Sequence, residues 1–139
     1  MKKVFGKIVF VDDEKYEKDL LQIALAQKQW KVEVLYFSDA VKALEYLKET
    51  KDYIFLIISD LSMPGMNGLE FKKALDEDPQ LCMKCLPFIF VSHGAIQKQI
   101  NKAWQYRVQG YFRKPVTVDE QADMLDIIIR YWIESRNPE

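Results

Sequence analysis

Glycine, cysteine and histidine are scarce in this 139-residue sequence, and each shortage argues against a class of site. The five glycines form neither a phosphate-binding loop nor a dinucleotide-binding pattern, which disfavours nucleotide binding. A closed zinc site needs four ligands, whereas the chain offers only Cys82, Cys85 and His93. The C-x-x-C pair precedes Pro87 rather than following an early strand, so we interpret it as two reduced thiols at a helix end.

An excess of one charge and a long apolar run are also missing. Twenty Lys and Arg residues nearly balance 21 Asp and Glu residues, which disfavours a general binder of nucleic acid or of membrane surfaces. Apolar runs such as residues 53–58 are far shorter than the roughly 20 residues that span a bilayer. We expect no cleavable leader at the N-terminus, because Lys7 interrupts its apolar stretch. We therefore expect a cytoplasmic protein with one domain over residues 1–139.

The hydrophobic pattern alternates short strand-like runs with longer helical stripes. The strand-like runs cover residues 8–11, 32–37, 54–58, 88–91 and 108–112. The stripes comprise Tyr16, Leu20, Ile23 and Ala24; Ala40, Ala43, Leu44 and Leu47; Phe71, Ala74 and Leu75; Ile96, Ile100, Ala103 and Trp104; and Ala122, Leu125, Ile129 and Trp132. Ser38 is the expected N-cap of the second helix, and Thr117 with Glu120 forms a capping box before the last. Five strands and five helices in strict alternation predict a doubly wound α/β fold, (βα)5, with a parallel sheet between two helical layers.

Chemically matched residues follow four of these strands. Asp12 and Asp13 end the first strand, Asp60 the third, and Ser92 the fourth, while Lys114 follows the fifth. The carboxyl ends of parallel strands share one edge of the sheet, where functional groups gather. Adjacent carboxylates repel one another, so their close packing needs a cation or shifted pKa values. Oxygen ligands suit Mg²⁺, and a bound Mg²⁺ in turn points to phosphate chemistry. An aspartate is a known covalent acceptor of phosphoryl groups, and a lysine and a hydroxyl can stabilise the charge on such a group.

Taken singly, each of these residues has an ordinary structural interpretation. Asp12, Asp13 and Asp60 could form turns or caps, Ser92 could cap the next helix, and Lys114 could be solvated. Four strand ends with matched chemistry make coincidence improbable.

Four sequence blocks, in order, resemble the receiver domain of two-component response regulators over essentially the whole chain. They are Val11-Asp12-Asp13-Glu14, Asp60-Leu61-Ser62-Met63-Pro64-Gly65-Met66-Asn67-Gly68, Phe90-Val91-Ser92 and Gly110-Tyr111-Phe112-Arg113-Lys114-Pro115. The second block fits the phosphoacceptor pattern D-x-x-M-P-x-M-x-G. The resemblance implies the flavodoxin-like strand order 2-1-3-4-5.

The resemblance also implies a role for each residue of the site. Asp60 would accept the phosphoryl group, Ser92 would hydrogen-bond it, and Lys114 would pair with it. Asp13 would bind Mg²⁺ directly and Asp12 largely through water, with Asp60 and the Ser62 carbonyl as further ligands. Tyr111 would be the switch ring, and Pro115 would follow a cis peptide bond.

A histidine kinase or phosphotransfer protein would be the phosphodonor. Output would then pass through protein contacts, because the sequence leaves no room for an output domain after the last helix. The candidate contact face includes Lys98, Asn101, Lys102, Gln105, Tyr111 and Arg113, and a merely solvated helix face is nearly as plausible an interpretation. Residues 136–139 could instead begin a linker in a longer hybrid kinase.

Two other classes stay open. An aspartate-nucleophile phosphatase would usually carry D-x-D after the first strand, where this chain has adjacent aspartates. A phosphorylation-independent scaffold is disfavoured by the complete set of site residues. We expect no enzymatic activity beyond the domain's own phosphorylation and dephosphorylation.

Three departures from the family pattern carry expectations of their own. Ser62 and Gly94 stand where the dephosphorylation rate is tuned, and neither can place water as an acid or amide would, so slow self-hydrolysis is expected. His93 replaces a small residue, and we favour an exposed loop histidine over a proton-transfer group. Without a glycine after the fourth helix, either the turn differs or Arg107 adopts a strained conformation.

Overall fold

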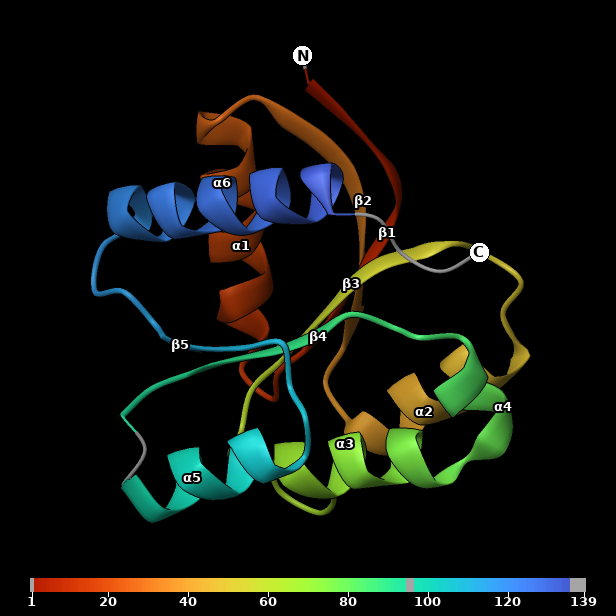
Figure 1. Cartoon of the computed structure of the whole chain (residues 1–139). Helices are drawn as coiled ribbons and strands as arrows, with labels where there is room; N and C mark the ends of the chain where they lie inside the picture. Colours follow the sequence, from red (N-terminus) through yellow and green to blue (C-terminus); the bar gives the residue numbers. More distant parts are fainter. Residues whose placement is uncertain (1, 95–96, 136–139) are drawn as a thin grey trace.

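The computed structural model describes residues 2–94 and 97–135, and its strands form one parallel sheet (Figure 1). The strands are β1 (Lys2–Val11), β2 (Trp30–Phe37), β3 (Ile54–Ser59), β4 (Phe88–Ser92) and β5 (Gly110–Arg113). Their order, β2-β1-β3-β4-β5, confirms the predicted topology. Both β3 and β4 are buried along their whole length, as expected for strands covered on both faces.

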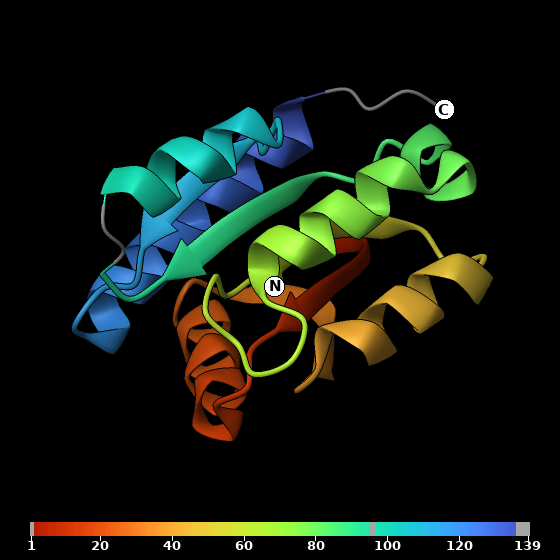
Figure 2. The ribbon, with the colours of Figure 1, turned by 90° about the horizontal axis from the view of Figure 1, so that it is seen from below.

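Helices cover both faces of this sheet. They are α1 (Lys15–Gln27), α2 (Ala40–Glu49), α3 (Gly68–Glu77), α4 (Pro79–Met83), α5 (Gln97–Gln105) and α6 (Val118–Glu134). Helices α1 and α6 lie on one face, while α2, α3 and α5 lie across the other (Figures 1 and 2). None of the described helices is long and apolar enough to cross a membrane.

The two hydrophobic cores follow from the two-residue period of the strands. In β1, Val9 and Val11 pack with α2 and α3, whereas Ile8 and Phe10 pack with α1 and α6. Successive side chains of one strand therefore pack into opposite layers. Polar groups are found instead at the ends of the strands, outside both cores.

Helix α4 was not predicted. Asp78 caps it, since its side chain accepts hydrogen bonds from the backbone of Gln80 and Leu81, and Pro79 occupies the first turn. The part of the chain that the structure describes therefore has six helices rather than five. Cys82 lies in α4 and Cys85 just beyond it, and both are exposed free thiols, as expected.

The predicted stripe of α1 is right at Ala24, which is buried, but wrong at Tyr16 and Ile23. Tyr16 and Ile23 are 53% and 51% exposed, and the buried positions are Glu17, Leu21, Ala24 and Leu25. The spacing is helical in both cases, but the true stripe begins with an acid, which a search for apolar residues passes over.

Smaller corrections concern the helix ends. Asp39, not Ser38, caps α2 with its side chain. Thr117 caps α6, accepting from the Glu120 amide and donating its own hydroxyl to the Glu120 carboxylate, so only half of the expected capping box forms.

The stripe predicted for α5 holds only in part. Ala103 is buried, Trp104 is 52% exposed, and Ile96 lies outside the described residues. Arg107 adopts φ 57° after α5, so the expected strain is present at a position that normally favours glycine.

Candidate functional site

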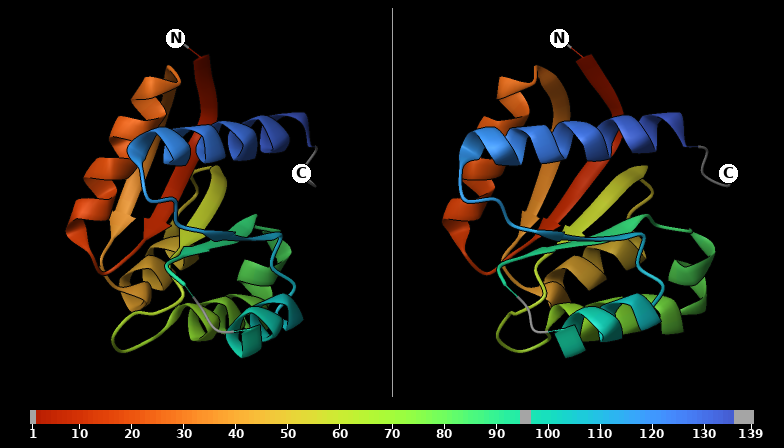
Figure 3. Two further views of the ribbon diagram at one scale, coloured as in Figure 1. Left: turned by 90° about the vertical axis from the view of Figure 1, so that its left-hand side faces the viewer. Right: turned by 60° about the vertical axis from the view of Figure 1, so that its left-hand side comes forward.

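The carboxyl ends of the strands converge at the end of the sheet opposite the N-terminus (Figure 3). Backbone hydrogen bonds fix the residues that follow β1, β3 and β5. The Asp12 amide donates to Phe37 O on β2, and the Asp60 amide to Val11 O on β1. The Lys114 amide donates to Ser92 O at 2.9 Å. The ladder thus continues past these three strands and brings their polar side chains to the edge where Ser92 ends β4.

Gly68 allows the loop after β3 to fold back on the site. A Cβ there would lie 2.3 Å from Asp60 O and 2.9 Å from Leu61 Cα, so no larger residue fits without moving backbone. Asn67 then caps α3 through a complete capping box with Glu70. The sequence of this loop is therefore explained by close backbone approach and by capping.

Asp12, Asp13 and Asp60 form a carboxylate cluster. Each offers one oxygen, and these atoms lie within 4.8 Å of one another. Asp12 is fully buried and Asp60 is 7% exposed, whereas Asp13 is open to solvent. Three carboxylates this close need a cation, and an all-oxygen donor set with one open side fits a hard divalent ion such as Mg²⁺.

Lys114 supplies one positive charge inside this cluster. Its Nζ donates to Asp12 Oδ2 at 2.6 Å and lies 3.9 Å from Asp60 Oδ2. Burial raises the pKa of Asp12, against the opposing effects of Lys114 and of the Glu14 amide. Burial acts to lower the pKa of Lys114, but the surrounding carboxylates outweigh it and raise that pKa, so the lysine stays charged.

The two oxygens of Asp60 differ in their partners. Oδ1 accepts hydrogen bonds from the Leu61 amide at 2.7 Å and from Ser92 Oγ at 2.8 Å. Among the described residues no hydrogen bond reaches Oδ2, whose ionic partner is Lys114. The carboxylate is thus fixed by one oxygen and can react through the other.

Tyr111 lies beside this edge on β5. Its hydroxyl is buried without a hydrogen-bond partner in the described part of the chain, and its ring centroid is 6.2 Å from that of Phe90. Burial raises the pKa of Tyr111, against a smaller opposing effect of the Ser92 hydroxyl. The predicted switch ring therefore lies next to the predicted phosphoryl-binding hydroxyl.

The remaining predicted residues have mixed outcomes. No peptide bond in the described chain is cis, so the bond before Pro115 is trans, contrary to expectation; this isomer is intrinsically favoured even before proline. Ser62 lies in the exposed loop after Asp60, and its role as a carbonyl ligand stays a prediction. Five of the six predicted contact residues on α5 and β5 are exposed, whereas Tyr111 is half-buried; the exposed ones are Lys98, Asn101, Lys102, Gln105 and Arg113.

Sequence reasoning missed Glu17. This α1 residue is 5% exposed, and its Oε1 lies 3.7 Å from Lys114 Nζ and 3.5 Å from His93 Nε2. Its position four residues before Leu21, at the start of the buried stripe, could have identified it as an inward-facing acid. His93 has a 67% exposed side chain, as the favoured interpretation of that residue expected.

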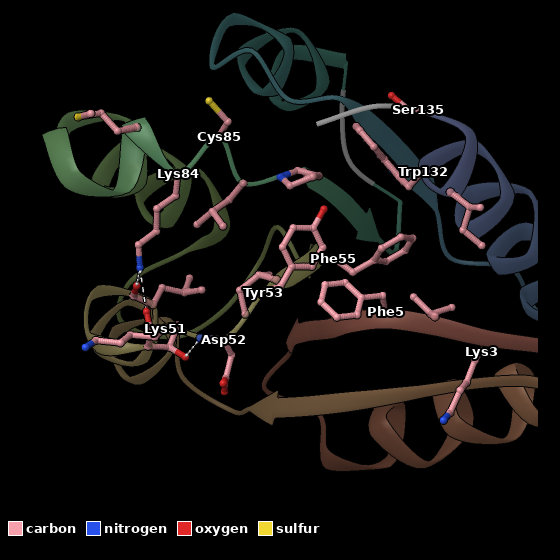
Figure 4. Close-up of a pocket in the computed structure, with 18 residues that line it drawn as sticks. Lys3, Phe5, Lys51, Asp52, Tyr53, Phe55, Lys84, Cys85, Trp132 and Ser135 are labelled. Carbon is pink, nitrogen blue, oxygen red and sulfur yellow. Dashed lines mark hydrogen bonds between the residues drawn. The ribbon is translucent and has the colours of Figure 1, made fainter. Parts of the chain in front are cut away.

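A hollow of about 1020 Å³ lies away from the carboxylate cluster. Phe5, Tyr53, Phe55 and Trp132 line it, and Lys84 beside it donates to two backbone carbonyls (Figure 4). None of the residues predicted to carry chemistry is among those that line it. The carboxylate cluster is therefore the better candidate for function.

Comparisons with known proteins agree with this geometry. The family model "Response regulator receiver domain" matches residues 8–126. Chemotaxis protein CheY-3 of Vibrio cholerae is 37% identical over 90 residues, which are 65% of this chain and 66% of that protein. Two-component response regulator ARR10 of Arabidopsis thaliana is 28% identical over 124 residues, which are 89% of this chain but 21% of that protein. This chain thus spans about a fifth of the length of that plant regulator.

Solved structures show the same fold. The phosphorylated cyanobacterial phytochrome response regulator RcpA has a TM-score of 0.83 and 25% identity, covering 96% of this chain and 98% of that one. Response regulator RPA3017, from red light signalling of R. palustris, has a TM-score of 0.86 and 19% identity, with coverage of 97% and 99%. With its sheet order, its acidic cluster and its matching family model, the chain belongs to the response regulator receiver domain family of two-component systems.

Proposed function

We propose that the protein is a phosphoacceptor: a histidine kinase or phosphotransfer protein phosphorylates Asp60, and the change is passed on through protein contacts. The observation that carries this proposal is the Asp60 carboxylate, anchored through Oδ1 and reactive through Oδ2, with Ser92 and Lys114 beside it. RcpA, which is similar over nearly its whole length, has been solved in phosphorylated form.

The chemistry follows from these contacts. Asp60 Oδ2 attacks the phosphorus of a phosphohistidine in line, the P–N bond breaks, and the imidazole leaves with the electron pair. The product is an acyl phosphate on Asp60. Lys114 turns from Asp12 toward the new phosphoryl oxygens, and the Ser92 hydroxyl, no longer bound to a free carboxylate, donates to one of them.

A divalent cation at the cluster would supply positive charge against the phosphoryl oxygens during transfer. Asp13 and Asp60 would hold it together with the Ser62 carbonyl. Both oxygens of Asp12 already accept hydrogen bonds, from Lys114 and from the Glu14 amide, so its contribution would pass through water. The open side of the cluster, where Asp13 is exposed, would admit the donor.

Output would depend on the β4–β5 edge. Phosphorylation replaces the single negative charge of the Asp60 carboxylate by about two on the phosphoryl group, a net gain of about one, so Ser92 must shift toward the phosphoryl oxygens and Tyr111 beside it must repack. The exposed face of α5 and β5, with Lys98, Lys102 and Arg113, would present this change to a protein partner.

Intact-mass spectrometry after incubation with Mg²⁺ and acetyl phosphate tests the proposal. The wild-type protein should gain one phosphoryl group and Asp60→Asn none, with both folded. A wild-type protein that gains nothing, and that also fails to bind beryllofluoride, would support the scaffold interpretation. Multiple turnover of a small phosphomonoester would support a phosphatase instead.

A further inference from the structure

Glu17 is a fourth carboxylate at the site, and the chemistry proposed above gives it no role. It contacts Lys114 from α1 at 3.7 Å, nearly the distance from Lys114 to Asp60. Its side chain is 6% exposed and that of Lys114 is 5% exposed, so solvent screens their interaction little. The ammonium thus faces three carboxylates and hydrogen-bonds only one, Asp12.

Glu17 lies in the first turn of α1, where an acid suits the positive end of the helix dipole. That preference would be met by an acid facing solvent, whereas Glu17 is buried and opens the stripe that continues with Leu21, Ala24 and Leu25. A buried carboxylate costs free energy unless it is paired, and among the described residues Glu17 has ionisable partners in Lys114 and His93. The burial of the carboxylate is therefore explained by those two contacts, in addition to the position of Glu17 in the first turn of the helix.

We propose that Glu17 is a positioning residue that holds Lys114 on the α1 side of the site, in competition with a phosphoryl group on Asp60, and that His93 sets the strength of this hold. The inference rests on the proposed function. Lys114 must approach a phosphoryl oxygen after transfer, and doing so takes it away from Glu17. His93 then remains as the nearer partner of the Glu17 carboxylate, with its Nε2 at 3.5 Å from Oε1.

The position of His93 makes this arrangement more than a local ion pair. His93 directly follows Ser92, whose hydroxyl must shift toward the phosphoryl group, and its imidazole reaches back to α1. When Lys114 leaves Glu17, the attraction between the Glu17 carboxylate and the His93 imidazole becomes stronger. Phosphorylation of Asp60 thereby changes the contact between His93, directly after β4, and α1.

Removal of the Glu17 charge has opposite effects on two ligands. An anionic phosphoryl mimic meets less repulsion and a freer Lys114, so it binds more tightly. A divalent cation loses a nearby negative charge, so it binds more weakly. A damaged fold would weaken the binding of both ligands. Tighter binding of the phosphoryl mimic together with weaker binding of the cation therefore distinguishes the proposed effect from misfolding.

The test titrates Mg²⁺ alone, and then beryllofluoride in excess Mg²⁺, into the wild type and Glu17→Gln, followed by amide NMR spectra that also report folding. We expect the variant to bind beryllofluoride roughly fivefold more tightly, the lower end of typical couplings between sites, and to bind Mg²⁺ more weakly. Asp19→Asn, which removes an exposed charge from the same helix, should change neither constant to a comparable degree. Glu17→Leu, which suits the buried stripe, should repeat the result if the glutamine variant folds poorly.

A double-mutant cycle tests the part of His93. His93→Ala should weaken beryllofluoride binding in the wild-type background, because Glu17 then depends on Lys114 alone, and should have no effect in Glu17→Gln. Weaker binding of both ligands to Glu17→Gln, unchanged binding, or an equal effect of His93→Ala in both backgrounds would overturn the inference. A wild-type protein that does not bind beryllofluoride would instead overturn the proposed function and the inference with it.

Discussion

Asp60→Asn should stabilise the folded protein when no divalent cation is present. The substitution removes one charge from the carboxylate cluster but keeps an oxygen that can accept from Leu61 and Ser92. With charges no more than 4.8 Å apart, each carboxylate pair repels by about 3.5 kcal/mol at an effective dielectric constant near 20. The attraction to Lys114 at 3.9 Å is about 4 kcal/mol and is also lost.

The balance decides the sign. Repulsion from the fully buried Asp12 persists at nearly its whole value, whereas solvent reduces that from the exposed Asp13 to less than half. Two repulsions then exceed one attraction by about 1 kcal/mol, which is the expected gain in the free energy of unfolding.

Urea denaturation followed by circular dichroism measures this gain in EDTA and again in excess Mg²⁺. A ligand that binds only the folded state stabilises it by mass action, so Mg²⁺ should raise the midpoint of the wild type. It should raise that of Asp60→Asn less, since one ligand oxygen no longer carries a charge. If the variant is less stable in EDTA, the carboxylates do not repel one another on balance. If it gains as much from Mg²⁺ as the wild type, Asp60 is not a ligand of the cation.

Three further predictions concern other parts of the molecule. The raised pKa of Lys114 means that the folded state holds this proton more tightly than the unfolded state does. The stability that the charged lysine supplies is therefore complete below pH 10.5 and is lost as the pH rises further. Above that pH, the urea midpoint of the wild type should fall more steeply than the midpoint of Lys114→Met. Neither Ser62 nor Gly94 can place a water as an acid or amide would, so the phosphoryl group on Asp60 should persist well beyond seconds, and Ser62→Asn should shorten its lifetime in a mass-spectrometric decay; a wild-type lifetime of seconds would contradict this. Arg107→Gly should raise the free energy of unfolding by about 0.5–1 kcal/mol in urea denaturation, because φ 57° suits glycine, and a loss of stability would show that the arginine side chain makes contacts that outweigh the strain.

The architecture could be predicted because its determinants are local and periodic. Short apolar runs such as the one at Ile54–Ser59 alternate with helical stripes, and this alternation permits few topologies other than a parallel sheet between two helical layers. The residues of the candidate site could be identified for the same reason, since Asp12, Asp60 and Lys114 follow a strand directly and Ser92 ends one. Helix α4 was missed because five residues give no measurable periodicity, and its capping by Asp78 with Pro79 resembles an ordinary turn.

The stripe of α1 shows why the remainder of the site could not be found in the same way. The search for periodicity assumes that buried positions are apolar, and at Glu17 that assumption fails because Lys114 compensates its charge and His93 lies beside it. Tyr16, Leu20 and Ile23 then give a more hydrophobic stripe on the wrong face of the helix. The two partners of Glu17 lie 76 and 97 residues further along the chain, so no local pattern connects them with α1. An inward-facing charge should therefore be sought in a helix that directly follows a strand ending in functional carboxylates. The sign to look for is a second helical stripe that begins with an acid and competes with the more apolar one.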